Sequence, residues 1–497
     1  MNISVNALNQ EIYNIPEDLN DLNGIEGFLS NQAGKKIIVV QGLGFVGAVM
    51  SLVCANAITE EYAVIGVDLA NEESYWKIKS INNGIFPLIA DDPKIDEFFE
   101  NTKLKGNFYA TCDPTAYSYA DIIIVDINLD VQKTSSEHCT LMDFDVDMNG
   151  FEAAMTVIGQ NCRENALILV ETTVPPGTCE NLVKPAIKRE LEKRNLSFDQ
   201  ISLGHSYERV MPGPEYIDSI RCFPRVYSGI DDNSADIIES FLKTIIDIDQ
   251  CQLTRLGHTN ASEMAKVLEN SYRATNIAFA VEWSRFAEEA GVDLYAIVDA
   301  IRVRKTHANL MFPGIGVGGY CLTKDPLLAS WARKSYFKST ESLEMSINSV
   351  SINDQMPIFA YKRLVEVFGS IENKNIVFLG VSYRGDVGDT RYSPVEPLFV
   401  NILKVGANIR LHDPFVSFWG EQNIYIESNI DDVLSSNPDL IILSTGHSIY
   451  RDEMVINKIL DVPATNIFDT IGLFNKIQLK ALQKKHKVSV LGRGDIL

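Results

Sequence analysis

The sequence lacks the features of membrane-spanning, secreted and polyanion-binding proteins. No apolar run approaches the roughly 18 residues that a bilayer crossing requires, and the start, MNISVNALNQEIYNIPEDLND, has no basic segment followed by an apolar one. Acidic residues outnumber basic ones: the chain has 66 aspartates and glutamates but 44 lysines and arginines, which gives a net charge of -22. This charge repels polyanions, so we expect no nucleic acid and no membrane as partner.

The eight cysteines form no C-x-x-C pair and no even disulfide framework. A chain of 497 residues with 46% hydrophobic content can build its cores without disulfides. This cysteine usage predicts reduced thiols and a cytoplasmic protein. The length suits about two to four domains.

Buried-strand patterns alternate with helix-length segments in two parts of the chain. Residues 1–34 are polar and weakly patterned, and we interpret them as an N-terminal extension. The apolar runs KIIVVQ, YAVIGVD, ADIIIVDIN and NALILVETT then favour a parallel sheet covered on both faces. Helical periodicity follows, and a second alternation begins at NKNIVFLGVSYRG. The sequence predicts an α/β protein with two Rossmann-like, doubly wound parallel-sheet domains, residues 35–250 and 356–497, joined by a mostly helical central domain, residues 251–355.

A glycine motif, GLGFVG, follows the first predicted strand. It places Gly42, Gly44 and Gly47 between a strand and a helix, and Asp68 ends the next strand. In this context the glycines let the backbone approach a pyrophosphate, and the carboxylate accepts hydrogen bonds from a ribose diol. Asp68 disfavours a 2′-phosphate, so the predicted cofactor is NAD and not NADP. The alternative is a tight turn that binds nothing.

The stretch FPGIGVGGYCLTKDP surrounds Cys321 with glycines. A lone cysteine is more often a small buried hydrophobic residue than a nucleophile. Here the glycines offer exposed backbone amides, Lys324 can favour a thiolate, and Asp325 can handle protons. We therefore predict that Cys321 is a nucleophile.

Glu263, Lys266 and Asn270 follow at steps of three and four, on one face of a predicted helix. For Glu263 and Lys266 alone, a solvated ion pair is the plainer interpretation. Asn270 suits a different task, because its amide is a neutral donor to a developing oxyanion.

Eight collinear motifs resemble those of a known family. They are GLGFVG, INNGIFP, ETTVPPGT, YERVMPG, EMAKVLENSYRATNIAFAVE, PGIGVGGYCLTKDP, LGVSYRGDVGDTRYSP and LHDP. From about residue 36 to about residue 471 the chain resembles the UDP-glucose/GDP-mannose dehydrogenase family of nucleoside-diphosphate-sugar 6-dehydrogenases. The resemblance implies a four-electron oxidation of a C6 hydroxyl to a uronic acid, with NAD as oxidant and a thiohemiacetal and thioester on Cys321.

The resemblance also implies roles for single residues. Lys266 stabilises negative charge on the C6 oxygen, Asn270 donates beside it, and Asp325 positions water or Lys266. Glu208 is the general base for thioester hydrolysis, and an exposed loop carboxylate paired with Arg209 is its alternative. The implied cofactor contacts are Gly42, Gly44, Phe45, Val46, Gly47, Asp68, Asn128, Glu171, Thr172, Thr173 and Lys324. The implied substrate contacts are Arg209, Gly318, Gly319, Tyr383, Arg384, Arg391 and His307.

Two positions depart from the family pattern. Asn128 stands where many relatives have a threonine beside the active-site water. His307, or Lys305 if the register slips by two, stands where relatives have an arginine that reaches across the dimer. For Arg384 and Arg391, surface salt bridges are the alternative to phosphate binding. The resemblance further implies a homodimer or larger homo-oligomer formed through the helical middle.

The substrate stays open within one class. A UDP-N-acetylhexosamine and UDP-glucose are the predicted UDP-sugars, and GDP-mannose is an alternative. A two-electron β-hydroxyacid dehydrogenase shares the K-x-x-x-N spacing but explains neither Cys321 nor a second α/β domain. A dinucleotide sensor on an inactive enzyme fold would not need the full polar set. No metal is expected.

Overall fold

The computed structural model describes residues 2–88, 92–210 and 213–496. The chain forms two compact units. The first unit contains residues 1–130, 146–267 and 331–339, and the second contains residues 131–145, 268–330 and 340–497. The chain therefore passes from one unit to the other five times. Among the described residues, no helix combines the length and the apolar character that a membrane crossing requires.

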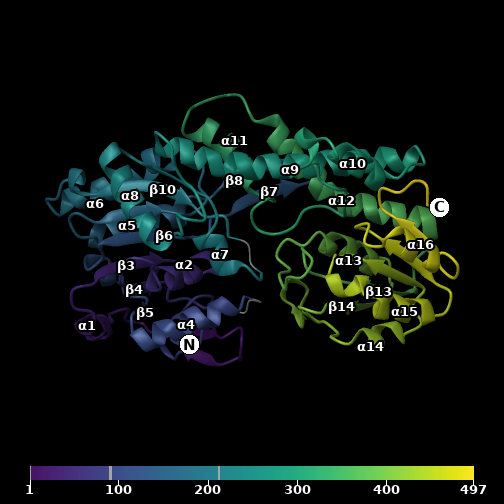
Figure 1. Ribbon diagram of the computed structural model, residues 1–497, viewed down its shortest axis with the longest axis horizontal. Coiled ribbons are helices and arrows are strands. Elements are labelled where there is room, and N and C mark those ends of the chain that lie inside the picture. Colours follow the sequence, from purple (N-terminus) through teal and green to yellow (C-terminus); the bar gives the residue numbers. More distant parts are fainter. Residues whose placement is uncertain (1, 89–91, 211–212, 497) are drawn as a thin grey trace. The chain divides into compact units, whose positions relative to one another are not determined.

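An eight-stranded sheet forms the centre of the first unit (Figure 1), in the order β12-β11-β10-β9-β6-β3-β4-β5. The strands from β5 to β10 are parallel, β11 is antiparallel to β10, and β12 is parallel to β11. The strand order reverses between β3 and β6, where a doubly wound sheet opens a crevice for a ligand. The strands are β3 (Lys36–Gln41), β4 (Tyr62–Val67), β5 (Phe108–Thr111), β6 (Ile122–Val125), β9 (Leu167–Val170), β10 (Ser202–Tyr207), β11 (Arg225–Gly229) and β12 (Leu253–Arg255).

Helices cover both faces of this sheet, and its strands β4, β6 and β9 are accordingly buried along their whole length. Every residue of β4 is buried. Helix α2, which packs against β3 and β4 and against α4 and α7, is buried from Gly47 to Ala55. The covering helices are α2 (Phe45–Ala55), α3 (Tyr75–Asn82), α4 (Pro93–Lys105), α5 (Asn149–Asn161), α6 (Lys184–Lys193), α7 (Tyr216–Arg221) and α8 (Asp232–Ile245). The predicted α/β architecture is confirmed for this unit, apart from the antiparallel pairing of β10 with β11.

The N-terminal residues fold onto the first unit. Strands β1 (Ile3–Val5) and β2 (Ile12–Asn14) pair antiparallel, and α1 (Leu22–Ser30) follows. The Ser4 hydroxyl donates to the Glu72 carbonyl at 2.7 Å, and the Asn6 amide donates to the Ser80 hydroxyl at 3.1 Å. The Asp21 carboxylate accepts from the Tyr109 hydroxyl at 2.7 Å. This segment is thus ordered by individual polar contacts, which leave no periodic pattern in the sequence.

A five-stranded parallel sheet forms the centre of the second unit, in the order β14-β13-β17-β18-β19. Two cores lie on its two faces, because alternate residues of β13 point to opposite sides: Ile376 and Phe378 face one core, Val377 and Leu379 the other. The strand order reverses between β13 and β17. The strands are β13 (Asn375–Leu379), β14 (Asn408–His412), β17 (Leu440–Leu443), β18 (Asn466–Asp469) and β19 (Lys487–Val490), and the helices are α13 (Val395–Lys404), α14 (Ile430–Leu434), α15 (Glu453–Asp461) and α16 (Lys476–Leu482). The predicted second doubly wound sheet is confirmed.

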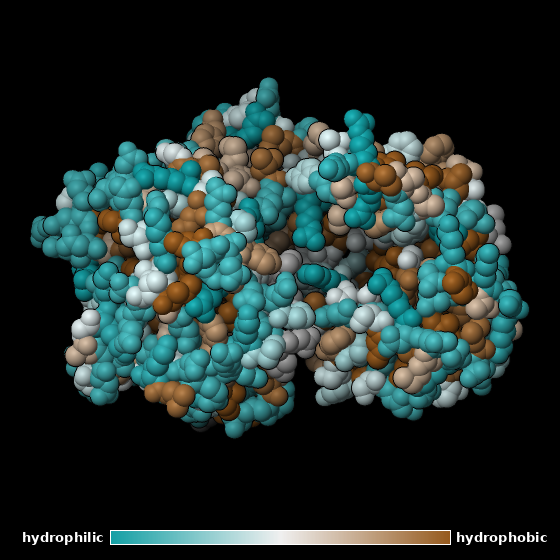
Figure 2. Space-filling view, in the orientation of Figure 1, coloured by the Kyte–Doolittle hydropathy of each residue, from teal (hydrophilic) through white to brown (hydrophobic). Residues whose placement is uncertain are grey.

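Four helices make up most of the predicted helical middle, which is likewise confirmed: α9 (Thr259–Glu289), α10 (Leu294–Arg302), α11 (Asp325–Ser335) and α12 (Glu344–Phe368). Exposed apolar residues follow one stripe of α9: Leu268, Tyr272, Phe279, Trp283 and Phe286. Hydrophobic residues also interrupt the hydrophilic surface over α10 (Figure 2), where Ile297 and Ile301 are exposed.

A hairpin of β7 (Val131–Ser135) and β8 (Leu141–Val146) leaves the first sheet after β6 and belongs almost wholly to the second unit. Lys133 on β7 forms an ion pair with Asp354 of α12 at 2.8 Å and lies 3.4 Å from the Thr323 carbonyl. The hairpin therefore contacts the segment that follows Cys321.

Candidate active site

The GLGFVG turn in the first unit is packed so closely that two of its glycines cannot carry a side chain. Gly42 has a φ of +93°, and a Cβ added there would lie 2.1 Å from the Asp126 carbonyl. A Cβ on Gly47 would lie 2.0 Å from the Gly42 carbonyl. At Gly44, by contrast, an added Cβ meets nothing within 4 Å. The first backbone amides of α2 are thus open to an approaching anion, while the turn beneath them is fixed.

Asp68 follows β4 and contacts this turn. Its Oδ2 accepts the Leu43 N–H at 2.9 Å, and its Oδ1 accepts the Leu69 N–H at 2.7 Å. Lys77 of α3 lies 3.9 Å from Oδ2. Each carboxylate oxygen keeps a further lone pair, so the group can still accept from a ribose diol. The turn and Asp68 together fit NAD, and Phe45, the first residue of α2, is exposed beside them, with Val46 half-buried.

Polar residues at the ends of β6 and β9 hold the next two loops together. The Thr172 hydroxyl accepts the Ile127 N–H at 2.8 Å and lies 3.2 Å from the Val125 carbonyl. Asn128 is exposed and Thr173 is half-buried. Thr172 therefore positions the loop that carries Asn128.

Glu171 is fully buried and lies 3.4 Å from the guanidinium of Arg225. Burial raises the pKa of Glu171 to about 7, although Arg225 opposes the shift. Burial and the neighbouring Glu171 also raise the pKa of Asp126. Sequence reasoning missed Arg225, since nothing in its own neighbourhood marks it as the partner of a carboxylate far along the chain.

Glu208 and Lys266 meet in the first unit, and both are buried. The Lys266 ammonium donates to the Glu208 carbonyl at 2.8 Å, lies 3.9 Å from Oε1 of the same residue and stands 5.3 Å from the ring centre of Tyr207. Glu208 is therefore not an exposed loop carboxylate. Arg209 donates to the Pro224 carbonyl at 2.6 Å. Met211 and Pro212 of the YERVMPG motif lie outside the described residues.

Glu263 is also buried, so the interpretation of a solvated ion pair with Lys266 is wrong for it. Its carboxylate accepts the backbone N–H groups of Gly177 at 2.5 Å, near the end of the ETTVPPGT motif, and of Cys179 at 2.8 Å, just after the motif. Burial raises the pKa of Glu263 to about 7. Glu263 anchors the start of α9 to the loop that follows β9.

Cys321 lies in the second unit, in the turn before α11. All eight cysteines lie within the described residues, none forms a disulfide, and Cys321 alone among them is exposed. Its carbonyl accepts the N–H groups of Lys324 at 3.2 Å and Asp325 at 2.9 Å, which fixes the turn. The alternative of a small buried hydrophobic residue is therefore wrong for Cys321.

The carboxylate of Asp325 is fully buried and binds a donor on each oxygen. The Asn270 amide donates to Oδ2 at 2.7 Å, and the Lys324 ammonium donates to Oδ1 at 2.7 Å. Lys324 also stands 4.4 Å from the ring centre of Tyr320. One carboxylate thus fixes the asparagine of α9 and the lysine that follows the cysteine.

The glycines before Cys321 pack against a loop of the second sheet. A Cβ on Gly318 would lie 2.5 Å from the Cβ of Tyr383, and the Gly319 N–H donates to the Arg391 carbonyl at 3.1 Å. The Arg391 guanidinium binds the Asp389 carboxylate through two nitrogens, at 3.0 and 2.6 Å. Arg384 is exposed on the same loop. Of the predicted substrate residues of this loop, Tyr383 and Arg391 therefore lie directly against the glycine-rich segment.

His307 lies apart from these groups. It is exposed in a short helical turn (Lys305–His307), and its Nδ1 is 2.9 Å from the Thr306 hydroxyl. A substrate contact by His307 stays a prediction.

Three regions of the chain match models of one protein family, the UDP-glucose/GDP-mannose dehydrogenases: the NAD binding domain at residues 35–247, the central domain at 260–354 and the UDP binding domain at 377–476. The UDP-N-acetyl-D-mannosamine dehydrogenase of Methanocaldococcus jannaschii is 27% identical over 470 residues, covering 93% of this chain and 98% of that protein. That of Pyrococcus horikoshii is 29% identical over 454 residues, covering 88% and 99%. The crystal structure of NDP-N-acetyl-D-galactosaminuronic acid dehydrogenase from Methanosarcina mazei has a TM-score of 0.74 at 25% identity, covering 95% and 98%.

Proposed function

Because this chain belongs to the UDP-glucose/GDP-mannose dehydrogenase family, we propose that it oxidises the C6 hydroxyl of a UDP-N-acetylhexosamine to the uronic acid. It is an oxidoreductase with an NAD binding domain and a UDP binding domain. The N-acetylated sugar is favoured because the three relatives compared above are all named for N-acetylated hexosamines or their uronic acids.

The exposed Cys321 beside the fixed Asp325 carries this proposal. The C6 alcohol loses a proton and a hydride to become an aldehyde, and the Cys321 sulfur adds to the aldehyde carbon. The thiohemiacetal loses a second hydride and becomes a thioester, since a bound hemithioacetal has a hydride to give and cannot diffuse away. Water then breaks the C–S bond. One alcohol, two NAD⁺ and one water give one carboxylate, two NADH and three protons.

The other polar residues act on charge and protons. Lys266 and Asn270, one turn apart on α9, stabilise negative charge on the C6 oxygen. Asp325 holds the Asn270 amide in the donating orientation, and Glu208 is the base that activates the hydrolytic water. Glu208 and Lys266 belong to the first unit, and Asn270, Cys321 and Asp325 belong to the second.

Gly42, Gly44, Gly47 and Asp68 hold NAD in this proposal. NAD, when bound, supplies the ring that accepts the hydride. The close packing at Gly42 and Gly47 and the open space above Gly44 support this assignment, because a pyrophosphate needs backbone amides without side chains in front of them.

The assembly is proposed to be a homodimer formed through α9. A stripe of exposed aromatic and aliphatic residues on this helix supports the proposal, because contiguous apolar surface of this kind marks an interface. A cytoplasmic location suits eight cysteines without a disulfide. There the enzyme would supply uronic-acid nucleotides for polysaccharide synthesis.

The test is the stoichiometry of NADH. The purified protein is incubated with NAD and, separately, with UDP-N-acetyl-D-mannosamine, UDP-N-acetyl-D-glucosamine, UDP-glucose or GDP-mannose. We expect two NADH for each molecule of an N-acetylated UDP-sugar and a uronic acid in the mass spectrum of the product. One NADH per sugar would identify a two-electron dehydrogenase, and turnover of GDP-mannose alone would overturn the UDP-sugar assignment.

A further inference from the structure

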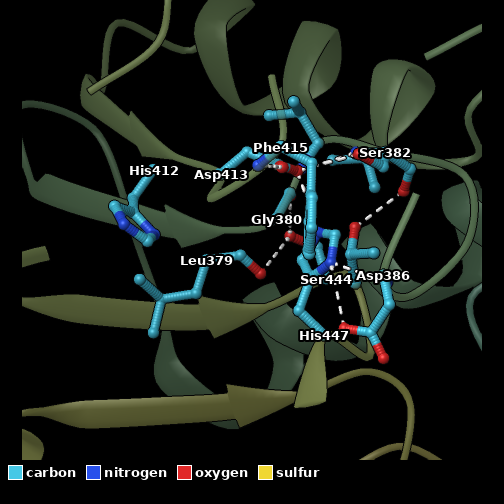
Figure 3. Close-up of polar contacts among 12 residues, drawn as sticks. Leu379, Gly380, Ser382, Asp386, His412, Asp413, Phe415, Ser444 and His447 are labelled. Carbon is cyan, nitrogen blue, oxygen red and sulfur yellow. Dashed lines mark hydrogen bonds and ion pairs between the residues drawn. The ribbon is translucent and has the colours of Figure 1, made fainter. Parts of the chain in front are cut away.

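A buried aspartate–histidine pair lies at the carboxyl end of the second sheet (Figure 3). Asp413 follows β14 and His447 follows β17, and Nε2 of the histidine lies 3.0 Å from Oδ2 of the aspartate. Both side chains are fully buried. Although burial opposes it, the hydrogen bond from His447 lowers the pKa of Asp413, so the pair contains an ionised carboxylate.

The Asp413 carboxylate also binds the start of the loop that follows β13. Its Oδ2 accepts the N–H groups of Val381 at 2.8 Å and Ser382 at 3.1 Å, and the Ser382 hydroxyl at 3.0 Å. Its Oδ1 accepts the Phe415 N–H at 2.9 Å. These donors occupy the carboxylate and hold the first residues of the loop.

His447 holds the middle of the same loop. Its Nδ1 accepts the Asp386 N–H at 2.9 Å. Because Nδ1 accepts and Nε2 donates, both bonds require the neutral ring with its proton on Nε2. Phe415 and Tyr450 pack against this ring, with ring centres 5.2 and 5.5 Å away, and fix its plane.

A second contact links Asp386 back to the histidine's segment. Asp386 has a backbone φ of +59°, in the left-handed region that residues other than glycine uncommonly adopt. Its Oδ1 accepts the N–H of Ser448 at 2.8 Å and the Ser448 hydroxyl at 3.0 Å. Two adjacent residues, His447 and Ser448, therefore bind the backbone and the side chain of one loop residue.

The first sheet shows why this loop needs such contacts. Gly380 after β13 repeats the geometry of Gly42 after β3: its φ is +99°, and an added Cβ would lie 2.3 Å from Thr445. After Gly42 the chain enters α2 at Phe45, whereas after Gly380 no helix starts before Val395. The residues from 381 to 394 thus lack helical hydrogen bonds. Asp413 follows its strand as Asp68 does in the first sheet, and its carboxylate accepts hydrogen bonds from this loop.

From these contacts we propose that His447 is a positioning residue for the UDP moiety of the substrate. It acts through Asp386 to hold the loop that carries Tyr383, Arg384 and Arg391, and the Arg391 carbonyl in turn binds Gly319 beside Cys321. The inference rests on the proposed function, since it takes a UDP-sugar as the ligand of this loop.

The test measures UDP binding to the full-length protein by calorimetry. His447→Ala is expected to raise the Kd for UDP about tenfold and to leave the Kd for NAD within about twofold, because a lost backbone restraint costs the loop its bound shape. His486→Ala is the matched control. His486 is a buried imidazole of the same unit whose Nδ1 accepts the Thr465 N–H at 3.3 Å, and its loss should leave UDP binding unchanged.

Two further substitutions separate positioning from general stability. In His447→Asn the side-chain oxygen can accept the Asp386 N–H in place of Nδ1, whereas His447→Gln keeps only the donor to Asp413. We expect Asn to restore UDP affinity to within about threefold of wild type and Gln to restore little. A merely structural role would give equal UDP affinity in the two.

Asp386 provides a variant at a half-buried loop position if His447→Ala does not fold. Asp386→Ala removes the acceptor for Ser448 and places alanine at a positive φ, so it should weaken UDP binding, while Asp386→Asn keeps the acceptor and tolerates that φ. Wild-type protein that fails to bind UDP would contradict the proposed function. Wild-type protein that binds UDP, with His447→Asn, His447→Gln and Asp386→Ala all binding it equally well, would overturn this inference.

Discussion

The Asn270 amide nitrogen lies 2.7 Å from Oδ2 of Asp325, although the two residues come from different helices, α9 and α11. Lys324 donates to the other oxygen, Oδ1. The Asp325 side chain can therefore bind Asn270 and Lys324 together only if both of its oxygens accept hydrogen bonds. The contact explains how an asparagine on α9 can be held in one orientation beside the turn that carries Cys321.

Asp325→Asn should lower kcat by about 10- to 100-fold and change the Kd for UDP by less than about threefold. Whichever way the new amide is turned, its NH₂ group faces Asn270 or Lys324, and one donor loses its partner. NADH formation measures the effect. Asp431→Asn is the control, because Asp431 pairs with Lys458 on the surface and surface pairs contribute little. An Asp325→Asn enzyme with wild-type kcat would show that Asp325 does not orient Asn270 for the reaction.

Cys321 should be the fastest-reacting thiol of the native protein. It is the one exposed cysteine among eight, so a thiol reagent is expected to label it first, as mass spectrometry of the peptides would show. Cys321→Ser should lose that label and form no uronic acid while still binding NAD, because serine cannot replace the sulfur in the thioester. Uronic acid at the wild-type rate from Cys321→Ser would remove the covalent mechanism.

Gly44→Ala and Gly47→Ala should differ in a defined way. A Cβ at residue 44 meets no protein atom, whereas one at residue 47 meets the Gly42 carbonyl at 2.0 Å. Gly44→Ala is expected to keep the wild-type Tm and to weaken NAD binding about tenfold or more, because the methyl group stands where the pyrophosphate approaches. Gly47→Ala should lower both the Tm and NAD affinity. If Gly44→Ala bound NAD normally, the cofactor would not lie over this turn.

Glu263 should make the protein less stable as the pH rises. Burial raises the pKa of Glu263 from 4.5 to about 7. Between these values the folded protein keeps a proton that the unfolded chain has released, so the free energy of unfolding falls with rising pH. The full shift corresponds to a loss on the order of 3 kcal/mol above the folded pKa. Burial also raises the pKa of Glu171 to about 7 and that of Asp469 to about 6, with the same sign.

Glu263→Gln removes this titration and should flatten the dependence of Tm on pH between about pH 5 and pH 8. Glu366→Gln, at an exposed carboxylate, is the control and should leave the dependence as it is. The contrary result, a Glu263→Gln protein with an unchanged pH slope, would mean that Glu263 stays ionised in the folded protein.

Trp283→Glu should dissociate the proposed dimer. Trp283 is 47% exposed, between Phe279 and Phe286 on the apolar stripe of α9. A charge there would be buried without a partner, so we expect the dimer Kd to rise about 100-fold or more. Sedimentation velocity measures it, with Lys480→Glu on α16 as a surface control. A wild-type protein that sediments only as a monomer would contradict the proposal directly.

Strands β4, β6 and β9 of the first sheet and β17 of the second could be predicted because they are continuous apolar runs bounded by turn residues. Strand β4 is buried along its whole length, and the glycine turns after β3 and β13 mark where a helix or loop must begin. The antiparallel β11 could not be predicted, since strand direction leaves no trace in composition. The fold of the N-terminal residues depends on single contacts such as that of Asn6 with Ser80. Such contacts produce no periodic pattern from which the fold could be predicted.

The parts of the candidate site that form one continuous motif could be predicted from the sequence. The parts that depend on contacts between distant residues could not. The glycines around Cys321 and the spacing of Lys266 and Asn270 stand in the sequence. The bonds from the Asn270 amide to Asp325 and from the Asp386 N–H to His447 join residues far apart along the chain, and only folding brings them together. Asp413 had one available signal, because it ends a strand as Asp68 does.

The division of the chain into two units has a consequence for how the protein can be made. Residues 131–145 belong to the second unit but leave the ribosome before most of the segments they pack with, such as α12, have been synthesised. Domains that are contiguous in the chain can fold one after another during translation. This hairpin can pack in place only after the later segments of the second unit have been synthesised. Because each unit is assembled from three separate stretches of the chain, a single cut cannot divide the protein into its two units.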